Sequence, residues 1–341
     1  MSKFKKFVIV GQGIAGSLLA LALMKEGHHI IIHDDGHQTS STKVSAGIFN
    51  PITGQRLIPI KQFDVFYATA MASYAQLAQQ FGIAIFTPKP LVRILLNEAE
   101  LIRCQQLGRD SQAGQYIKAI YPSGKYHPVL KDPYGCVEFL NAGYCKAPLL
   151  LQTLREYFKN QGVLQEGVFD YRQAGNDKVI YCEGFAARHN PHLSYLTFNH
   201  VKGEILTLRV DGGLLPEVIL NQHVWCVPQG DNIFLAGSTY DRENLDLKPT
   251  LAGERIIIDG IKNFINAPIT VLNHHAGVRP VMLDTMPVLG DLDHLPNSAI
   301  FNGFGSKGFL MVPYYAGMFV DYLIRGKAIP RAVHVNRFKR I

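Results

Sequence analysis

The chain has 341 residues, of which 47% are hydrophobic and 18% charged, with 34 lysine and arginine residues against 27 aspartate and glutamate residues. This composition excludes a disordered chain, a collagen-like repeat and a small disulfide-stapled domain, while the length allows two or three domains or one two-lobed enzyme. The net charge of +7, taken alone, suggests nucleic acid or an anionic membrane surface as a partner.

The excess of positive charge lies at the two ends of the chain. Residues 11–324 hold 25 of the 34 basic side chains and all 27 acidic ones, so the central part is slightly acidic. We therefore expect solvated basic tails that could touch a membrane surface or an acidic partner, and we do not expect a nucleic-acid partner. The basic residues of the tails are Lys3, Lys5, Lys6, Arg325, Lys327, Arg331, Arg337, Lys339 and Arg340.

The cysteines and the apolar runs predict a cytoplasmic protein without a transmembrane segment. The apolar stretch 309–324 contains Pro313 and Asp321, and no secretory signal is visible. An odd number of scattered cysteines without a Cys-x-x-Cys pair indicates free buried thiols in a reducing compartment. They are Cys104, Cys136, Cys145, Cys182 and Cys226.

The first 35 residues have the order strand, turn, helix, strand. Residues 6–10 form a continuous apolar run, typical of a parallel strand buried on both faces, and residues 17–25 have helical character. The turn between them carries glycines with distinct tasks. Gly11 permits the tight turn, Gly13 lets the backbone approach a pyrophosphate, and Gly16 lets the helix pack close to the strand.

The second strand ends at Asp34, which completes a dinucleotide-binding pattern. The free amides and the positive end of the helix meet the phosphates, and Asp34 can accept hydrogen bonds from ribose hydroxyls. An acidic residue here argues against NADP, whose extra phosphate prefers an arginine. The motif alone does not separate FAD from NAD.

The segment after Asp34 favours FAD. A polar loop of small residues follows, and the stretch 46–56 reads AGIFNPITGQR. It resembles the second FAD-contacting loop of the D-amino-acid oxidase/glycine oxidase (DAO) superfamily of flavoproteins. Later segments are similar to family motifs in the same order, namely 179–184, 200–208, 225–239, 277–290 and 303–308. The family usually has Ala-Thr-Gly where this chain has Cys182, Glu183 and Gly184.

The last motif also has a physical interpretation of its own. A strand at 299–301 enters a glycine-rich loop, and an apolar helix begins near Phe309, with Pro313 tolerated in its first turns. A helix start and loop amides stabilise an anionic group, and Lys307 would add to this field unless it points to solvent. In the family this group is the pyrimidine edge of the flavin.

The resemblance implies an α/β, two-lobed fold, in which a Rossmann-like FAD-binding lobe carries an inserted mixed β-sheet substrate lobe. Residues 63–81 are predicted to form a helix that ends at Gly82. The substrate-lobe segments read as strands separated by turns. The FAD-binding lobe is expected at 1–84, 145–200 and 272–341, and the substrate lobe at 85–144 and 201–271.

The resemblance also implies an activity. An amine or amino acid would be dehydrogenated at its C–N bond by hydride transfer to flavin N5, the imine would hydrolyse, and oxygen or another acceptor would take the electrons. Arg279 would hold the substrate carboxylate, because a planar guanidinium binds a carboxylate through two hydrogen bonds. The alternative for Arg279 is an ion pair with Asp284. Tyr240 and His275 are secondary candidates for lining the pocket, and packing roles are the alternative for both.

Non-covalent FAD is the expected cofactor, and no metal site is indicated, since His274 and His275 are adjacent on a strand. Asn50 and Arg56, beside the flavin loop, could face the substrate. The expected cofactor contacts are Gly11, Gly13, Ile14, Ala15, Gly16, Asp34, Ser41, Thr42, Ala46, Gly47, Val168, Gly184, Arg279, Gly303, Gly305, Ser306, Lys307, Gly308 and Phe309.

Two alternative functions stay open. The loop at 46–56 also resembles the FAD domain of the bifunctional tRNA wobble-uridine enzyme, which suggests a modified tRNA as substrate. The departure at Cys182 and Glu183 leaves room for an FAD-binding protein without amine oxidase activity. The identity of the amine, the electron acceptor and the oligomeric state are not determined by these motifs.

Overall fold

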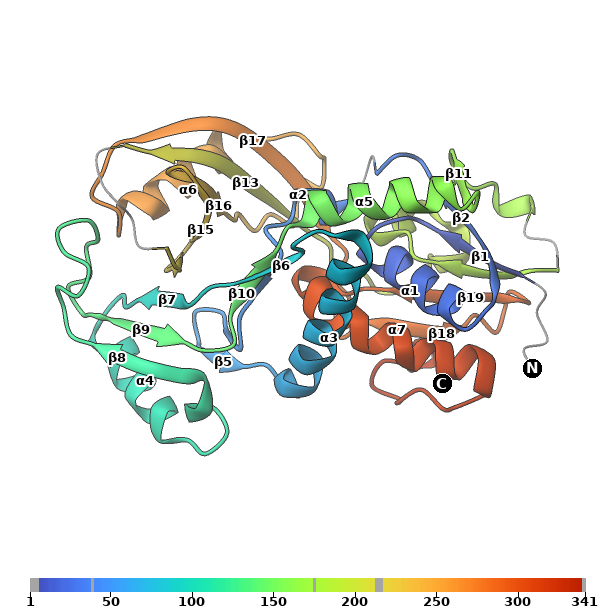
Figure 1. Cartoon of the computed structure of the whole chain (residues 1–341), viewed down its shortest axis with the longest axis horizontal. Helices are drawn as coiled ribbons and strands as arrows, with labels where there is room; N and C mark the ends of the chain where they lie inside the picture. Colours follow the sequence, from blue (N-terminus) through green and yellow to red (C-terminus); the bar gives the residue numbers. More distant parts are fainter. Residues whose placement is uncertain (1–5, 38–39, 174–175, 212–216, 339–341) are drawn as a thin grey trace.

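The computed structural model describes residues 6–37, 40–173, 176–211 and 217–338, and Figure 1 shows two lobes side by side. One lobe contains a six-stranded sheet in the order β11-β2-β1-β12-β19-β18, parallel except for β18. The predicted α/β class and the first three predicted elements are confirmed. The strands are β1 (Lys6–Val10), β2 (His29–Asp34), β11 (Leu164–Glu166), β12 (Lys178–Tyr181), β18 (Val288–Asp291) and β19 (Ser298–Asn302).

Strand β1 shows why an unbroken apolar run forms a central strand. Phe7 and Ile9 enter the core on one face of the sheet, and Val8 and Val10 enter the core on the other. Because successive side chains of a strand point to opposite faces, both faces must be covered. Helices α1 (Ile14–Lys25) and α7 (Gly308–Arg325) pack against each other over the first face.

The region between the sheets is built from helices and short strands. Helix α3 spans Phe63–Phe81 and ends at Gly82 in the left-handed conformation with φ 66°, as predicted. The polar loop at 40–51 contains the one-turn helix α2 (Ser41–Val44). The remaining elements are β3 (Ile48–Phe49), β4 (Ile52–Thr53), β5 (Ile58–Pro59), β6 (Phe86–Pro88), β10 (Gly143–Cys145) and α5 (Ala147–Asn160).

The second lobe is built on an eight-stranded sheet in the order β17-β13-β16-β15-β14-β7-β9-β8. It is mixed because β14 and β7 run parallel while the other pairs are antiparallel. The expected boundary at residue 271 falls inside β17. The strands are β7 (Leu91–Ile94), β8 (Ile117–Tyr121), β9 (Cys136–Phe139), β13 (Val201–Val210), β14 (Ile219–Asn221), β15 (Trp225–Gly230), β16 (Ile233–Gly237) and β17 (Ile269–Arg279).

Two helices in this lobe were not predicted, and the expectation of strands alone is wrong here. Helix α4 spans Glu98–Arg109 and helix α6 spans Leu251–Lys262. Asn97 accepts a hydrogen bond from the Glu100 amide at 2.9 Å, and the Glu100 carboxylate accepts one from the Leu96 amide at 2.8 Å. This reciprocal capping satisfies amides that would otherwise lack partners at the start of α4.

Most of the described basic residues near the chain ends form ion pairs, and several of these paired side chains are still exposed to solvent. Lys6 lies 3.2 Å from Asp177, and Arg337 lies 2.6 Å from Asp284. Arg325 and Lys327 each lie 2.7 Å from a carboxylate oxygen of Asp321, and Arg331 is exposed. The predicted tail residues Lys3, Lys5, Lys339 and Arg340 lie outside the described residues. Across the described part of the chain, no helix is both long and apolar enough for a bilayer span.

His200 gives the fold a predictable response to acid. His200 is 8% exposed, and its ring stacks on Phe198 at 4.8 Å. Burial is the main cause that lowers its pKa from 6.5 to about 4. Between pH 6.5 and about 4, His200 is protonated in the unfolded chain but stays neutral in the folded chain. The free energy of unfolding therefore decreases as the pH falls through this range.

We expect the free energy of unfolding of the wild type to decrease between pH 7 and pH 5. In His200→Phe, which keeps a ring but cannot be protonated, this decrease should be smaller by about 1 kcal/mol, allowing for partial solvent access. Urea unfolding at the two pH values measures the difference. An equal decrease in both proteins would contradict the assignment to His200.

Candidate functional site

A cavity of about 1420 Å³ lies where the two lobes meet, since residues of both large sheets line it. Cavities for single drug-sized ligands are about 300–1,000 Å³, so this one has room for a dinucleotide and a substrate. Eighteen of the predicted site residues line it. They are Gly11, Gly13, Ile14, Ala15, Asp34, Ser41, Thr42, Ala46, Gly47, Val168, Gly184, Tyr240, Arg279, Gly305, Ser306, Lys307, Gly308 and Phe309.

Two predicted cofactor contacts are not part of this lining. Gly16 is buried beneath the turn, where a Cβ atom would collide with the carbonyl oxygen of Gly11. Gly303 has φ +82°, and a Cβ atom there would lie 2.7 Å from the Met282 side chain. Both glycines therefore allow close packing behind the wall of the cavity, and their direct contact with the cofactor stays a prediction.

The turn between β1 and α1 forms one end of the cavity, which we call the nucleotide end. Gly11 has φ +100°, and an added Cβ would lie 2.7 Å from the Cys182 carbonyl oxygen. The Ile14 amide, at the start of α1, donates to Thr42 Oγ1 at 3.3 Å. Gly13 lies close to Thr42, since a Cβ atom at Gly13 would be 3.5 Å from Thr42 Oγ1. This arrangement suits a pyrophosphate, because a helix start presents amides and a positive dipole end.

Asp34 lies at the nucleotide end with its carboxylate already engaged. One oxygen accepts from the Gln12 amide at 2.8 Å. The other accepts from the amides of Gly36 and His37, at 2.9 and 3.1 Å, and from Arg155 at 2.7 Å. Arg155 is buried and was missed by the sequence analysis. The carboxylate is thus fixed in place, and its remaining lone pairs could accept ribose hydroxyls.

Unpartnered polar atoms beside Asp34 show that the nucleotide end suits a polar ligand. His37 and Ser40 line the cavity, and neither the His37 ring nitrogens nor Ser40 Oγ has a hydrogen-bond partner. Buried polar groups of this kind are normally satisfied by a partner. Burial is the main cause that lowers the pKa of His37, although Asp34 opposes it. The residues present therefore fit the adenosine and phosphate parts of FAD.

Cys182 and Glu183, which differ from the family pattern, still form part of the cavity wall. Cys182 contacts the glycine turn through its backbone, donating its amide to Val10 at 2.8 Å. The Glu183 carboxylate accepts from Tyr171 at 2.6 Å and from Asn190 at 2.8 Å. Burial raises the pKa of Glu183. The Glu183 side chain is therefore held by protein partners, the Cys182 side chain is buried, and Gly184 lines the cavity as predicted.

Lys307 and the start of α7 carry positive charge at the cavity wall. A short turn at Gly305–Lys307 leads directly into α7, as the sequence predicted. Lys307 is half-buried and lines the cavity, which excludes a fully solvent-facing side chain. Desolvation by burial lowers the pKa of Lys307. No carboxylate of the described residues lies within ion-pair distance of it.

Arg279 ends β17 and lines the part of the cavity beside the eight-stranded sheet, which we call the substrate end. The lining residues that we assign to this end are Arg56, Asn221, Gln222, Trp225, Tyr240, Arg242 and Arg279. Arg279 donates to Ser238 Oγ at 2.5 Å and to the Thr239 carbonyl at 3.4 Å, and its guanidinium lies 4.7 Å from the centre of the Tyr240 ring. Burial is the main cause that lowers the pKa of Arg279.

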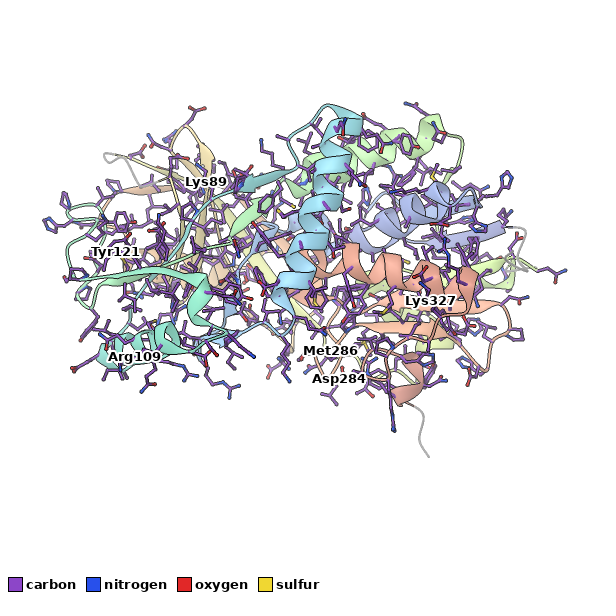
Figure 2. All side chains as sticks on the ribbon, turned by 60° about the horizontal axis from the view of Figure 1, so that its bottom comes forward. Lys89, Arg109, Tyr121, Asp284, Met286 and Lys327 are labelled. Carbon is purple, nitrogen blue, oxygen red and sulfur yellow. The ribbon has the colours of Figure 1, made fainter. Side chains whose placement is uncertain are left out.

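The alternative ion pair between Arg279 and Asp284 is absent among the described residues. Asp284 instead pairs with Arg337, whose Nη2 also donates to the Met286 carbonyl at 3.0 Å. Figure 2 places Asp284 and Met286 together on the surface of the lobe that contains α7. The Arg279 guanidinium thus has neutral hydrogen-bond partners and no described carboxylate, so its charge is available to a ligand.

Gly203 makes room for that guanidinium. A Cβ atom at Gly203 would lie 2.6 Å from Arg279 Cζ, closer than real Cβ atoms approach other heavy atoms. In the sequence, Gly203 is recognisable only as part of the strand motif at 200–208. Gln222, Trp225 and Arg242 were not predicted as site residues, because only the tertiary fold brings them to the same cavity.

Of the secondary candidates, Asn50, Arg56 and Tyr240 line the cavity, and Tyr240 is 72% exposed. His275 is exposed and lies outside the lining, so the expectation that it lines the pocket is wrong. In a strand, side chains at adjacent positions point to opposite faces.

Comparisons with known proteins give matches over nearly the whole chain. The model of the DAO family, described as FAD-dependent oxidoreductase, matches residues 6–322. The glycine oxidase of Pseudomonas putida is 24% identical over 95% of this chain and 96% of its own length. The crystal structure of glycine oxidase from Bacillus cereus shares the fold, with a TM-score of 0.79 at 20% identity over 96% of this chain and 97% of that chain.

One relative is a larger protein. The tRNA 5-methylaminomethyl-2-thiouridine biosynthesis bifunctional protein MnmC of Marinobacter nauticus is 21% identical over 98% of this chain. The matched region spans 58% of that protein's length. The similarity therefore concerns one part of a bifunctional protein.

Proposed function

This chain belongs to the DAO family of FAD-dependent oxidoreductases, and from that premise we propose that it dehydrogenates the C–N bond of a small amine or amino acid. The single observation that carries the proposal is the Arg279 guanidinium, which faces the cavity without a carboxylate partner among the described residues. Similarity to glycine oxidases supports glycine or another small amino acid as the substrate class.

FAD, when bound, supplies the hydride acceptor for this oxidation. Gly11, Gly13 and Thr42 at the nucleotide end would hold its phosphates, and Asp34 its ribose. Lys307 and the start of α7 would stabilise negative charge on the pyrimidine edge. We assign the six-stranded lobe to FAD binding and the eight-stranded sheet to substrate binding, which moves the expected boundary from 271 to the end of β17.

The residues of the substrate end perform the positioning. Arg279 binds the substrate carboxylate through its planar fork, and Ser238 and Tyr240 keep the guanidinium in one orientation. Gln222 is 7% exposed, and its unpartnered Oε1 can accept a hydrogen bond from the substrate amine. The amine must react in its neutral form, and no carboxylate lines this end to stabilise an ammonium ion.

Purified protein reconstituted with FAD should convert at least one small amino acid or secondary amine to a carbonyl product. A hydrazine reagent traps and quantifies this product, with oxygen and an artificial dye tested in parallel as electron acceptors. Protein that binds FAD but forms no carbonyl product from a broad panel of amines, with either acceptor, would contradict the proposal.

Substitution of Gly203 by alanine should move the Arg279 side chain without unfolding the protein. The new Cβ meets the far end of a flexible side chain, so the guanidinium shifts and the backbone stays in place. We expect KM for the amino acid to rise about tenfold, because a misplaced fork loses one charge-assisted hydrogen bond. Steady-state kinetics at matched FAD content measures this, and an unchanged KM would show that Arg279 does not bind the carboxylate.

The similarity to MnmC supports a second candidate, in which the amine belongs to a modified tRNA. Arg56 and Arg242, both exposed and both lining the cavity, would then meet phosphates near the amine. Titration of the protein with tRNA at several salt concentrations tests this, since phosphate contacts make the affinity steeply salt-dependent. Absence of binding at low salt would exclude the candidate.

The five buried free cysteines support a reducing compartment such as the cytoplasm.

A further inference from the structure

The substrate end carries more positive charge than a single carboxylate requires. Arg56, Arg242 and Arg279 line it, and none of the three pairs with a carboxylate in the described parts of the chain. A fourth arginine, Arg93, is neutralised by Glu100 at 2.5 Å. After Arg279 has been assigned to one carboxylate, two cations are left without an anionic partner.

No acidic side chain of the described lining balances these cations. The lining carboxylates are Asp34, which ends β2, Asp35, which follows it, and Glu183, which lies after β12. Asp34 is paired with Arg155, and Glu183 is held by Tyr171 and Asn190. The two ends of the cavity therefore differ in charge, and the substrate end selects for anions.

Arg242 is placed by a short extended segment beside Arg279. The Asp241 backbone exchanges two hydrogen bonds with Lys202, at 2.8 and 3.1 Å. Side chains alternate in extended backbone, so Tyr240 and Arg242 lie on the same side, and both line the cavity. The Asp241 carboxylate accepts from the amides of Glu243 and Asn244, at 2.8 and 3.0 Å, so it is committed to its own turn.

Arg56 lines the same cavity from a separate segment of the chain. It lies on the turn between β4 and β5, which is closed by a hydrogen bond from the Leu57 amide to the Gly54 carbonyl at 3.2 Å. Leu57 is 2% exposed and anchors the turn, while Arg56 is exposed and lines the cavity. An anchored turn that presents an unpaired arginine is suited to bind an anion.

We propose that the substrate carries a second anionic group in addition to the carboxylate held by Arg279, and that Arg56 and Arg242 bind this second group. The inference rests on the proposed oxidation of an amine in the same cavity. It specifies the substrate class as an amino acid with an acidic side chain, or a glycine with an acidic substituent on nitrogen.

The test compares acids with their amides, which match them in shape but lack the second charge. The first pair is iminodiacetate and its monoamide, and the second is aspartate and asparagine, each as both enantiomers. In the FAD-loaded enzyme we expect kcat/KM for the acid to exceed that for the amide about tenfold in at least one pair, since one charge-assisted hydrogen bond is at stake. The ratio should decrease with added salt, because both arginines are exposed.

Substitutions identify the residues responsible. Arg56→Gln and Arg242→Gln should each reduce the acid-to-amide ratio severalfold, and Arg56→Lys and Arg242→Lys should restore part of it. Arg331→Gln is the matched control, because Arg331 is exposed and lies outside the cavity lining. It should leave the ratio as in the wild type, and FAD absorbance verifies that each variant is folded.

The outcomes separate the two proposals. Oxidation of both amides at rates equal to or above those of their acids would overturn the second-anion inference and leave the proposed function standing. An acid preference that survives both glutamine substitutions would overturn the assignment to Arg56 and Arg242. Failure of every amine, acid or amide, to be oxidised would overturn the proposed function and the inference together.

Discussion

Replacement of Arg279 by glutamine should reduce kcat/KM for the amino-acid substrate about 100-fold while FAD stays bound. Glutamine keeps a polar group of moderate size but removes the charge and the two-pronged geometry. Because Arg279 has no carboxylate partner among the described residues, its removal leaves no protein anion unpaired. The loss should therefore appear in substrate binding and turnover rather than in folding.

Arg279→Lys separates charge from geometry. Lysine restores the positive charge but presents no planar fork, so we expect only partial recovery of kcat/KM. Arg209→Gln, on the exposed part of the same sheet, is a control for the substitution itself. Steady-state kinetics with equal FAD content would contradict the assignment if Arg279→Gln retained wild-type kcat/KM.

Replacement of Gly16 by alanine should cause the largest loss of stability and of FAD affinity. The added Cβ would collide with the Gly11 carbonyl oxygen and lie 3.2 Å from Ile9 Cγ2. Both neighbours are rigid, since one is backbone and the other belongs to a buried strand. Helix α1 must move away from β1, which displaces the amides that would meet the phosphates. We expect a decrease of about 3 kcal/mol in the free energy of unfolding.

Gly317→Ala is the matched control for this change. Gly317 lies on the exposed side of α7, and an added Cβ would meet no atom within 4 Å. Alanine is favoured over glycine inside a helix, so this variant should be as stable as the wild type or slightly more stable. Thermal unfolding and FAD titration of both variants measure the effect. Equal stability and equal FAD affinity of Gly16→Ala and the wild type would contradict the packing role.

The parts of the fold that could be predicted depend on contacts close in sequence. The strand at 6–10 was recognisable because residues 7–10 are all apolar. The helix at 63–81 was recognisable because its helical spacing of apolar residues ends at Gly82, a residue type that readily adopts the left-handed backbone. Helix α4 was missed although its capping pair, Asn97 and Glu100, is visible in the sequence. The surrounding prolines and strand-like runs outweighed that short signal.

The parts of the site that were not predicted depend on contacts between residues distant in sequence. The pairing of Asp284 with Arg337, 53 residues away, decides that Arg279 is free for a ligand. The contact between Asp34 and Arg155 spans 121 residues, and it fixes the carboxylate expected to hold the ribose. Opposite charges attract in any arrangement, so sequence alone does not determine which acid neutralises which base. The tertiary fold makes this choice.

The measurement that tests the central claim most directly is the anaerobic reduction of the bound flavin by a small amino acid. The FAD-loaded protein should lose its absorbance near about 450 nm on addition of a suitable amine, and Arg279→Gln should lose it far more slowly. A wild-type protein that keeps this band with every amine tested, yet loses it with dithionite, would contradict the account.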